Sequence, residues 1–369
     1  MTRHTNDDQA SALVPGAQRA LANRVSTLAQ RTLDDFKRLT AQQEELDRLR
    51  EIIKHDIEQC ERALMRGDSD ASYLRPVYAE RLPDWRRAAE LGWPKGQCLV
   101  GRCFRVGIGV EENPVEAVRW FRKAAEQGYA AAQHDLGYCY DVGLGVDEDQ
   151  AEAVRWWRKA AEQGYAAGQC ELGGCYYLGH GVDQDDAMAV HWYHKAAAQG
   201  YARAQYSLGW YYYLGHGVDQ DDAMAVHWYH KAAAQGYAAA QHRLGWCYYR
   251  GRGVAQDQAE AVRWFRKAAE QGDAAAQHGL GYCYYLGHGV DQDDAMAVHW
   301  YHKAAAQGDA LAQCNLGYCY YHGRGVAQDQ AEAVRWSRKA AEQGDERAKR
   351  LLDMVSSTAG STNKLKNNG

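Results

Sequence analysis

Residues 129–164 read YAAAQHDLGYCYDVGLGVDEDQAEAVRWWRKAAEQG, and this 36-residue stretch organises most of the chain. The same pattern recurs from Trp93 to Gly344 without an insertion, which makes seven copies. A fixed period of this length is typical of a solenoid, in which each unit packs against its neighbours. The period is marked by the glycine that closes each unit, at Gly92, Gly128, Gly164, Gly200, Gly236, Gly272, Gly308 and Gly344.

Each unit carries start and stop signals for two helices. In the quoted unit the first helix is predicted from about Ala130 to Val142, and it ends at Gly143 because glycine readily adopts the left-handed conformation that follows a helix. Asp149 then begins the second helix as its N-cap, and Glu152 completes a capping box. The G-x-G pair between the helices follows a helix rather than a strand, so it does not predict a phosphate-binding loop.

The apolar residues of a unit form one stripe on each helix. In the first helix the stripe contains Ala132, Leu136 and Tyr140, and in the second it contains Val154 and Ala161. One helix pair cannot bury enough apolar surface to be stable alone, so stacking must supply the rest. We therefore predict a core role for the tryptophan of each second helix, at Trp120, Trp156, Trp192, Trp228, Trp264, Trp300 and Trp336.

The composition is that of an ordinary soluble protein, with 369 residues, 46% apolar and 25% charged. The net charge is -5 and the basic residues are spread evenly through the repeats, so no patch is expected that would bind nucleic acid. The N-terminus does not resemble a signal peptide, and no apolar run reaches the roughly 18 residues that a membrane span needs. We expect a cytoplasmic protein without a nucleic-acid or membrane partner.

Nine of the ten cysteines fall at two positions of the repeat. Other copies carry histidine or tyrosine at these positions, so no disulfide partner is provided systematically. The pattern favours buried free thiols over disulfides. The residues are Cys98, Cys170 and Cys314 at the first position, and Cys103, Cys139, Cys175, Cys247, Cys283 and Cys319 at the second.

The repeats divide the chain into five parts. We predict a flexible arm over residues 1–17 and a helical, coiled-coil-like region over 18–83. The solenoid then spans 84–344, with a partial leading repeat before the seven full ones. A capping helix over 345–355 follows, because a terminal repeat needs a polar outer face, and a disordered tail over 356–369 completes the chain.

The region before the repeats contains one amphipathic helix or a pair of them. Glutamine or threonine interrupts its apolar stripe, so no regular heptad seam is sustained. Two roles stay open, a helical cap on the solenoid or a coiled coil that makes a homodimer. Pro83 is predicted to interrupt the helix that follows, because proline has no N–H to donate. The stripe consists of Leu28, Phe36, Leu39, Leu46, Leu49, Ile53, Ile57, Cys60 and Leu64.

The repeat pattern is A-x-A-Q-x-x-L-G-x-x-Y, then G-x-G-V, then D-x-A-x-A-V-x-W-x-x-K-A-A-x-Q-G. It resembles the Sel-one-like repeat family, a branch of the tetratricopeptide superfamily, and the resemblance covers roughly Trp85 to Val355. It implies an all-α fold, a right-handed α–α superhelix of helix-turn-helix repeats. It also implies a non-enzymatic adaptor that assembles other proteins, in bacterial regulation, envelope biology, host interaction or eukaryotic protein quality control.

A second stripe on the first helix of each unit lies opposite the core, and in tetratricopeptide-like solenoids it lines the concave face. Tyrosine and tryptophan provide large contact area with little loss of conformational entropy, so we predict that a protein or peptide partner binds there, with Trp210 and Trp246 as anchors. The alternative is that neighbouring rings simply cover one another between repeats. The candidate residues are Tyr138, Tyr206, Trp210, Tyr213, His242, Trp246, Tyr249, His278, Tyr282, Tyr285, Tyr318 and Tyr321.

The outer stripe of the second helix occurs in two kinds. Four copies carry arginines, such as Arg155 and Arg158, and three carry histidines, such as His191 and His194. The histidine spacing would allow a metal ligand pair, but arginine cannot serve as a ligand and no carboxylate or thiol completes a set, so no metal site is predicted. The histidines are interpreted as solvated, with a pH response near pH 6 as a hypothesis.

An enzyme is not predicted, and neither is a cofactor. No pair of cysteine and histidine stands out from the periodic background as a nucleophile and its base. The alternatives are a secreted-type β-lactam-binding hydrolase or a host-interaction effector of the same repeat family. The hydrolases of that family have paired cysteines eight apart in each repeat and a signal peptide, and this sequence has neither.

Overall fold

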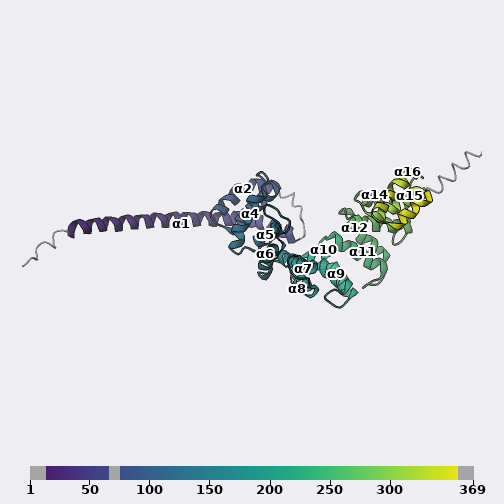
Figure 1. Ribbon diagram of the computed structural model, residues 1–369, viewed down its shortest axis with the longest axis horizontal. Helices are drawn as coiled ribbons and strands as arrows, with labels where there is room; N and C mark the ends of the chain where they lie inside the picture. Colours follow the sequence, from purple (N-terminus) through teal and green to yellow (C-terminus); the bar gives the residue numbers. More distant parts are fainter. Residues whose placement is uncertain (1–13, 66–74, 356–369) are drawn as a thin grey trace, which may run out of the picture. The chain divides into compact units, whose positions relative to one another are not determined.

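The computed structural model describes residues 14–65 and 75–355 (Figure 1). All regular secondary structure in these residues is α-helical, which confirms the predicted fold class. A last helix, without a label, spans 346–355. The labelled helices are α1 (Val14–Met65), α2 (Arg75–Glu90), α3 (Pro94–Val106), α4 (Pro114–Glu126), α5 (Ala130–Asp141), α6 (Gln150–Glu162), α7 (Ala166–Leu178), α8 (Asp186–Ala198), α9 (Ala202–Leu214), α10 (Asp222–Ala234), α11 (Ala238–Arg250), α12 (Gln258–Glu270), α13 (Ala274–Leu286), α14 (Asp294–Ala306), α15 (Ala310–His322) and α16 (Gln330–Glu342).

The chain divides into two compact units. Of the described residues, the first comprises 14–59 and 75–127, and the second comprises 60–65 and 128–355. The first of the seven repeats, formed by α3 and α4, therefore groups with α2 and α1 rather than with the other six. The predicted disordered tail and most of the predicted arm lie outside the described residues, although α1 begins within that arm, at Val14.

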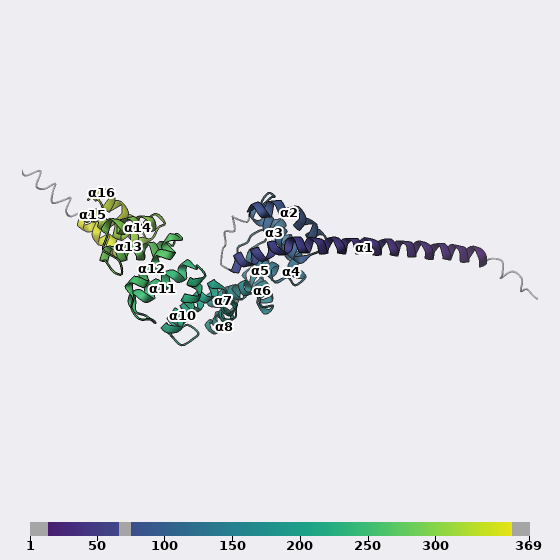
Figure 2. The ribbon, with the colours of Figure 1, turned by 180° about the vertical axis from the view of Figure 1, so that it is seen from behind.

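In the second unit, α5–α16 stack as helix pairs (Figure 2). Each first helix packs against the second helix of its own repeat, and each second helix packs against the first helix of the next repeat. The order α5, α6, α7 and onward is thus a chain of neighbours in space, which confirms the predicted solenoid. No membrane-crossing segment is found here, because none of the described helices combines the necessary length with sufficient apolar character.

The helix boundaries follow the local signals in the sequence. The backbone N–H of Glu152 donates a hydrogen bond of 2.9 Å to Oδ1 of Asp149, which satisfies one of the free donors at the start of α6. Gly143, just beyond α5, has a φ of 66°, in the left-handed region that glycine adopts without steric cost. The predicted N-cap is confirmed, and α5 ends at Asp141, one residue earlier than predicted. The predicted capping box is wrong, because the N–H of Asp149 donates to the carbonyl of Tyr140 while the carboxylate of Glu152 accepts from Arg155.

The core lies between the two helix layers. One leucine from each first helix is fully buried, from Leu136 in α5 to Leu316 in α15. The predicted core tryptophans are buried in α6 to α16, while Trp120 in α4 is half-buried. The nine repeat cysteines are buried free thiols, which confirms that prediction. The apolar stripes of the repeat therefore hold the stack together, as their spacing indicates.

The two halves of α1 have different surroundings. Near its end, Leu46, Leu49 and Ile53 are buried in the first unit, and Arg87 of α2 donates two hydrogen bonds of 2.8 Å to the carboxylate of Glu45. Residues 30–44 are all exposed to solvent. Hydrogen bonds that they form, such as those of Gln30 with Asp34 and of Thr40 with the carbonyl of Phe36, stay within α1. The buried part of α1 therefore belongs to the core of the first unit.

The prediction that Pro83 interrupts its helix is wrong, because α2 runs through it from Arg75 to Glu90. Proline within a helix costs roughly 3 kcal/mol. Its neighbours Leu82 and Trp85 are 5% and 0% exposed, and burying a large apolar side chain contributes about 1.5–3 kcal/mol. Packing of α2 offsets the cost, while Pro83 itself lies on the exposed side of the helix.

Candidate partner-binding site

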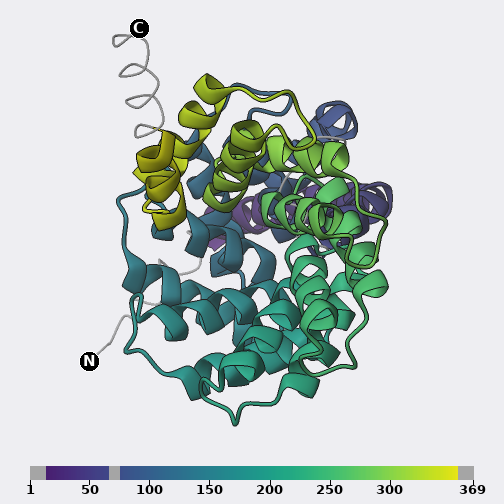
Figure 3. The same cartoon turned by 90° about the vertical axis from the view of Figure 1, so that its right-hand side faces the viewer.

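In the second unit, the layer of first helices is spaced more closely than the layer of second helices. Two pairs of successive first helices, α5 with α7 and α11 with α13, contact each other directly, and no pair of successive second helices among the described residues does so to this extent. In a curved array the more closely spaced layer is the inner one. Figure 3 shows the helices of this unit, coloured from teal to yellow, following such a curve. We call the surface of the first helices that faces away from the second helices the inner groove.

All twelve candidate residues lie on first helices of this unit, from α5 to α15. Tyr138 is 42% exposed, and the other eleven are half-buried. They therefore belong neither to the closed core nor to a fully solvated surface. The inner groove offers ring faces and edges that are held in place but remain accessible in part.

Several candidate rings contact one another along the groove. Trp210 stacks on Tyr213 with ring centroids 6.0 Å apart. In the next repeat Trp246 meets Tyr249 edge to face at 5.3 Å. Tyr249 reaches Tyr282 of the following repeat, with centroids 6.2 Å apart. The structure thus brings neighbouring candidates from α9 to α13 into pairs, including one that spans two repeats.

Near the end of the array, Tyr285 in α13 and both candidate rings in α15 contact arginine or histidine side chains. Tyr318 and Tyr321 do not meet directly but contact the same imidazole, that of His322, at 6.2 and 4.9 Å. The ring of Tyr285 lies 3.8 Å from the guanidinium carbon of Arg324. These rings remain part of the same surface, but arginine and histidine side chains interleave with them.

The candidates at one position of the repeat contribute to packing between the layers. Tyr206 lies 5.9 Å from Tyr229, and His278 lies 5.8 Å from Tyr301, measured between ring centroids. His242 lies 6.1 Å from Phe265 in the same way. The alternative of rings that cover one another therefore describes this position of the repeat. Trp246, Tyr249 and Tyr285 also pack against core clusters, while part of each side chain stays accessible.

Buried histidines in the groove are held by hydrogen bonds. Nε1 of Trp246 donates to Nε2 of His242 at 2.9 Å, so this imidazole nitrogen is an acceptor. Burial lowers the pKa of His242 to about 4, and nearby Arg243 and His278 act in the same direction while Asp273 opposes them. Burial also lowers the pKa of His278. Both imidazoles are thus neutral at pH 7, so the positive charge of the groove is carried by its arginines.

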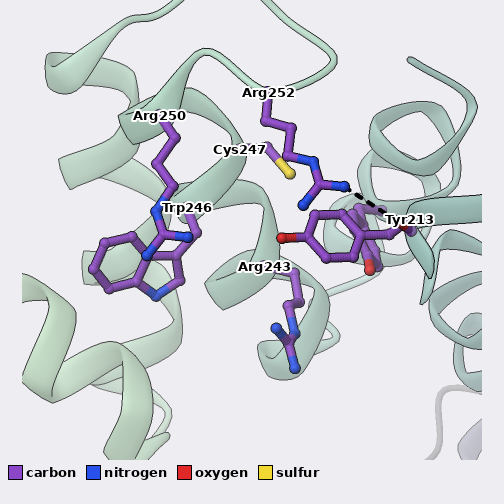
Figure 4. A pocket seen from close by; sticks show the side chains of 7 residues that line it. Tyr213, Arg243, Trp246, Cys247, Arg250 and Arg252 are labelled. Atoms are coloured by element: carbon purple, nitrogen blue, oxygen red, sulfur yellow. Dashed lines mark hydrogen bonds between the residues drawn. The ribbon is translucent and has the colours of Figure 1, made fainter. Parts of the chain in front are cut away.

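The sequence reasoning missed a cluster of three arginines in the fifth repeat, and Figure 4 shows it at close range. The guanidinium of Arg252 lies 3.6 Å from the ring centroid of Tyr213, that of Arg250 lies 5.0 Å from Trp246, and that of Arg243 lies 4.3 Å from Trp210. Cation–π contacts of this kind contribute about 0.5–2 kcal/mol each. Comparison of the copies could have found it, because other repeats carry no arginine at the positions of Arg243 and Arg250.

The outer stripe differs from its interpretation as solvated. His191 is exposed, but His194 is half-buried and its Nε2 lies 3.2 Å from the hydroxyl of Tyr212 in the next repeat. In arginine copies Nη2 of Arg158 donates to Tyr176 at the same distance, 3.2 Å. The second residue of each pair therefore joins repeats. Burial, with a smaller contribution from His191, lowers the pKa of His194. This imidazole therefore gains its proton at a lower pH than an ordinary histidine does.

Reactive groups are suppressed by burial in this part of the chain. Burial raises the pKa of Cys247 to about 11 and that of Cys283 to about 12, so neither thiol is ionised at neutral pH. Among the described residues, no group of three or more histidine, cysteine or acidic side chains is placed to hold a metal ion.

The depressed pKa of His242 makes stability depend on pH. The unfolded chain, with an ordinary histidine pKa near 6.5, binds the proton first as the pH falls, so this contribution is complete above pH 6.5 and is lost toward pH 4. We expect His242 to lower the free energy of unfolding by about 2 kcal/mol between pH 7 and pH 5. Thermal or urea melts at both pH values measure it.

The matched control is His242→Tyr, since Tyr206 occupies this position in the preceding repeat. The variant should lose less stability than wild type over the same pH interval, because the other histidines with lowered pKa are unchanged in both proteins. Equal losses would show that His242 does not contribute.

Comparison with known proteins agrees with this architecture. The family model described as Sel1 repeat matches seven times, at residues 94–129, 130–165, 166–201, 202–237, 238–273, 274–309 and 310–345. Among curated protein sequences, none matches the chain. Proteins built from this repeat generally mediate protein–protein interactions and are typically not catalysts.

Two solved structures are similar over most of the chain. One is c5321, a protective antigen present in uropathogenic Escherichia coli strains that displays an SLR fold, with 36% identity, a TM-score of 0.66, and 84% of this chain and 67% of that chain covered. The other is a Sel1 repeat protein from Oxalobacter formigenes, with 34% identity, a TM-score of 0.60, and 84% and 93% covered. With seven matched repeats and these structural relatives, the chain belongs to the Sel1-repeat family.

Proposed function

We propose that this chain is a non-enzymatic scaffold of the cytoplasm that holds a segment of a partner protein along the inner groove. The observation that carries the proposal is the series of half-buried rings from Tyr206 to Tyr321, which one face of the second unit presents without enclosing them. Trp210 and Trp246 occupy the same position in successive repeats and serve as the anchors.

The energetics favour a binding role for these two indoles. Each is already ordered by neighbours, Trp210 by Tyr213 and Trp246 by Phe265 at 5.2 Å, so a partner would bind without first fixing their rotamers. Interfaces owe most of their affinity to a few aromatic or arginine side chains in such surroundings. A segment that crosses both repeats would contact both anchors.

Affinity capture from the source cell tests this function, with the full-length wild type compared with a variant that lacks both indoles. A partner held in the groove is captured by the wild type alone. If the same partners bind both proteins, the inner groove is not the binding surface.

We also propose that the first half of α1 pairs with the same helix of a second chain. Leu28, Phe36 and Leu39 are 66%, 66% and 60% exposed. Leu39 precedes the buried Leu46 by about two helical turns, so the exposed residues continue the face that is buried further along. A long helix with an apolar face and no neighbour is stabilised by pairing with another helix.

Light scattering coupled to size exclusion tests the pairing on the full chain. We expect a dimer for the wild type and a monomer for the variant Leu28→Ser, Phe36→Ser, Leu39→Ser, with unchanged melting of the repeats because these side chains are exposed. Leu33→Ser is the control, since Leu33 is 46% exposed but lies about 140° around the helix from Leu28. A monomeric wild type would contradict the proposal.

A further inference from the structure

A small pocket lies where α9, α10 and α11 meet, and Figure 4 shows the side chains that line it. Tyr213 comes from α9, Tyr229 comes from α10, and the remaining lining residues come from α11 and the turn after it. Its volume of about 20 Å³ has room for roughly one water molecule or a group of similar size. The lining residues are Tyr213, Tyr229, Arg243, Trp246, Cys247, Arg250 and Arg252.

The pocket contains more hydrogen-bond donors than acceptors. Nε of Arg252 donates to both carboxylate oxygens of Asp222 at 2.9 Å, so this one guanidinium is neutralised. Arg243 and Arg250 lie on tryptophan rings, and within the described part of the chain neither forms an ion pair with a carboxylate. Two of the three positive charges at the pocket therefore have no counter-charge.

Tyr229 adds an unpaired hydroxyl. Its side chain is 1% exposed, and within the described residues its hydroxyl has no hydrogen-bond partner. Burial raises the pKa of Tyr229 far above its usual range, so the hydroxyl keeps its proton and is a donor. A buried polar group without a partner costs about 1–3 kcal/mol, which a ligand with an acceptor atom would recover.

Comparison with the other copies shows that this arrangement is specific to one repeat. The hydroxyls equivalent to that of Tyr229 lie near neutral polar side chains, that of Tyr193 near Ser207 and that of Tyr301 near Asn315. Arg243 replaces those side chains in the fifth repeat. At this junction a cationic side chain therefore lines the pocket beside the unpaired hydroxyl, where the equivalent junctions have serine or asparagine.

The second arginine is also a departure from the pattern. At the position of Arg250 the neighbouring repeats carry Leu214 and Leu286, and leucine there leaves the groove apolar. Glu171 stands at the position of Arg243 two repeats earlier, where it already pairs with Arg203. The unpaired positive charge of the groove is therefore concentrated at the fifth repeat.

We propose that this pocket binds the side-chain carboxylate of an aspartate or glutamate in the partner segment, an inference that rests on the proposed function of the groove. A carboxylate is the planar acceptor that guanidinium groups bind with two parallel hydrogen bonds. Tyr213 and Trp246 then pack against the methylene groups of the bound side chain.

The test begins with a phage-displayed library of random peptides selected on the full-length wild-type chain. Fluorescence anisotropy of the selected peptides then compares wild type with Arg243→Ser, Arg250→Leu, which installs the residues of the fourth repeat, Ser207 and Leu214. These residues occur naturally in a folded neighbour, so the variant should retain its fold. Its melting temperature and helical circular dichroism verify this.

The control variant removes the same two charges from the opposite face. Arg263→His, Arg266→His places the histidines of sister repeats on α12, and histidine can replace the bond of 3.1 Å that Arg266 donates to the hydroxyl of Tyr284. We expect the pocket variant to bind an acidic peptide at least about ten-fold more weakly, and the control to bind as wild type does. Replacing the acidic residue of the peptide by its amide should cause the same loss, and combining both changes should add little.

Other outcomes overturn the inference. If the selected peptides show no preference for acidic residues, or bind the pocket variant as tightly as wild type, the carboxylate assignment is wrong, while continued dependence on Trp210 and Trp246 would leave the groove itself supported. If phosphoserine in place of the acidic residue binds tighter, the ligand is a phosphate. If no selected peptide depends on either tryptophan, the proposed function fails as well.

Discussion

The double variant Trp210→Ala, Trp246→Ala is expected to lose the partner that the wild-type chain retains. Aromatic side chains at the centre of an interface contribute about 2 kcal/mol or more each, which corresponds to roughly thirty-fold in affinity. The two indoles belong to successive repeats, so a segment along the inner groove would contact both, and we expect a combined loss of roughly a hundred-fold or more. Affinity capture and quantitative binding of the captured partner measure it.

A loss of binding is informative only if the array stays folded. Trp246 contacts Phe265 and His242 as well as solvent, so its removal lowers stability somewhat even without a partner. The variant Trp210→Tyr, Trp246→Tyr is the matched control, since Tyr282 occupies this position in the sixth repeat. Tyrosine should restore most of the binding, and helical circular dichroism and melting should be close to wild type for both variants. Unchanged partners in the alanine variant would exclude the groove.

Gly253→Ala is expected to destabilise the array by about 4 kcal/mol or more, a loss that only a few mechanisms produce. Gly253 has a φ of 72°, which costs alanine about 1–2 kcal/mol. A Cβ there would also overlap the backbone carbonyl of Asp222, in the first turn of α10 in the preceding repeat, and would come within 3.0 Å of the nitrogen of Ala223. Backbone cannot rotate away as a side chain can, so the repeats must separate locally.

The variant Gly236→Ala separates the cost of a positive φ from the cost of the overlap with neighbouring backbone. Gly236 has a φ of 90°, but an added Cβ would meet no atom within 4 Å. This variant should therefore lose only the conformational part, about 1–2 kcal/mol. Urea and thermal unfolding, followed by circular dichroism, compare the two. Equal shifts in the unfolding midpoint would show that the close approach between repeats does not matter.

The period and the helix boundaries can be predicted from the sequence because their causes are local. The N-cap Asp149 bonds to an N–H three residues away, and Gly143 ends α5 through its own φ, so neither depends on a distant part of the chain. The core tryptophans follow from the same spacing, since a stripe at helical period must face the next layer. The failure at Pro83 has the opposite origin, because buried neighbours offset a local penalty.

The sequence by itself determined a stack of helical pairs, most of the residues in their core, and which stripe carries the aromatic candidates. Only the tertiary structure decided how residues from different copies meet. It brings Tyr229 of one repeat beside Arg243 of the next, and Gly253 against the backbone of Asp222, contacts that depend on how neighbouring repeats stack. Periodicity specifies the face on which a side chain lies, but not its distance or partner across a junction, and recognition depends on these.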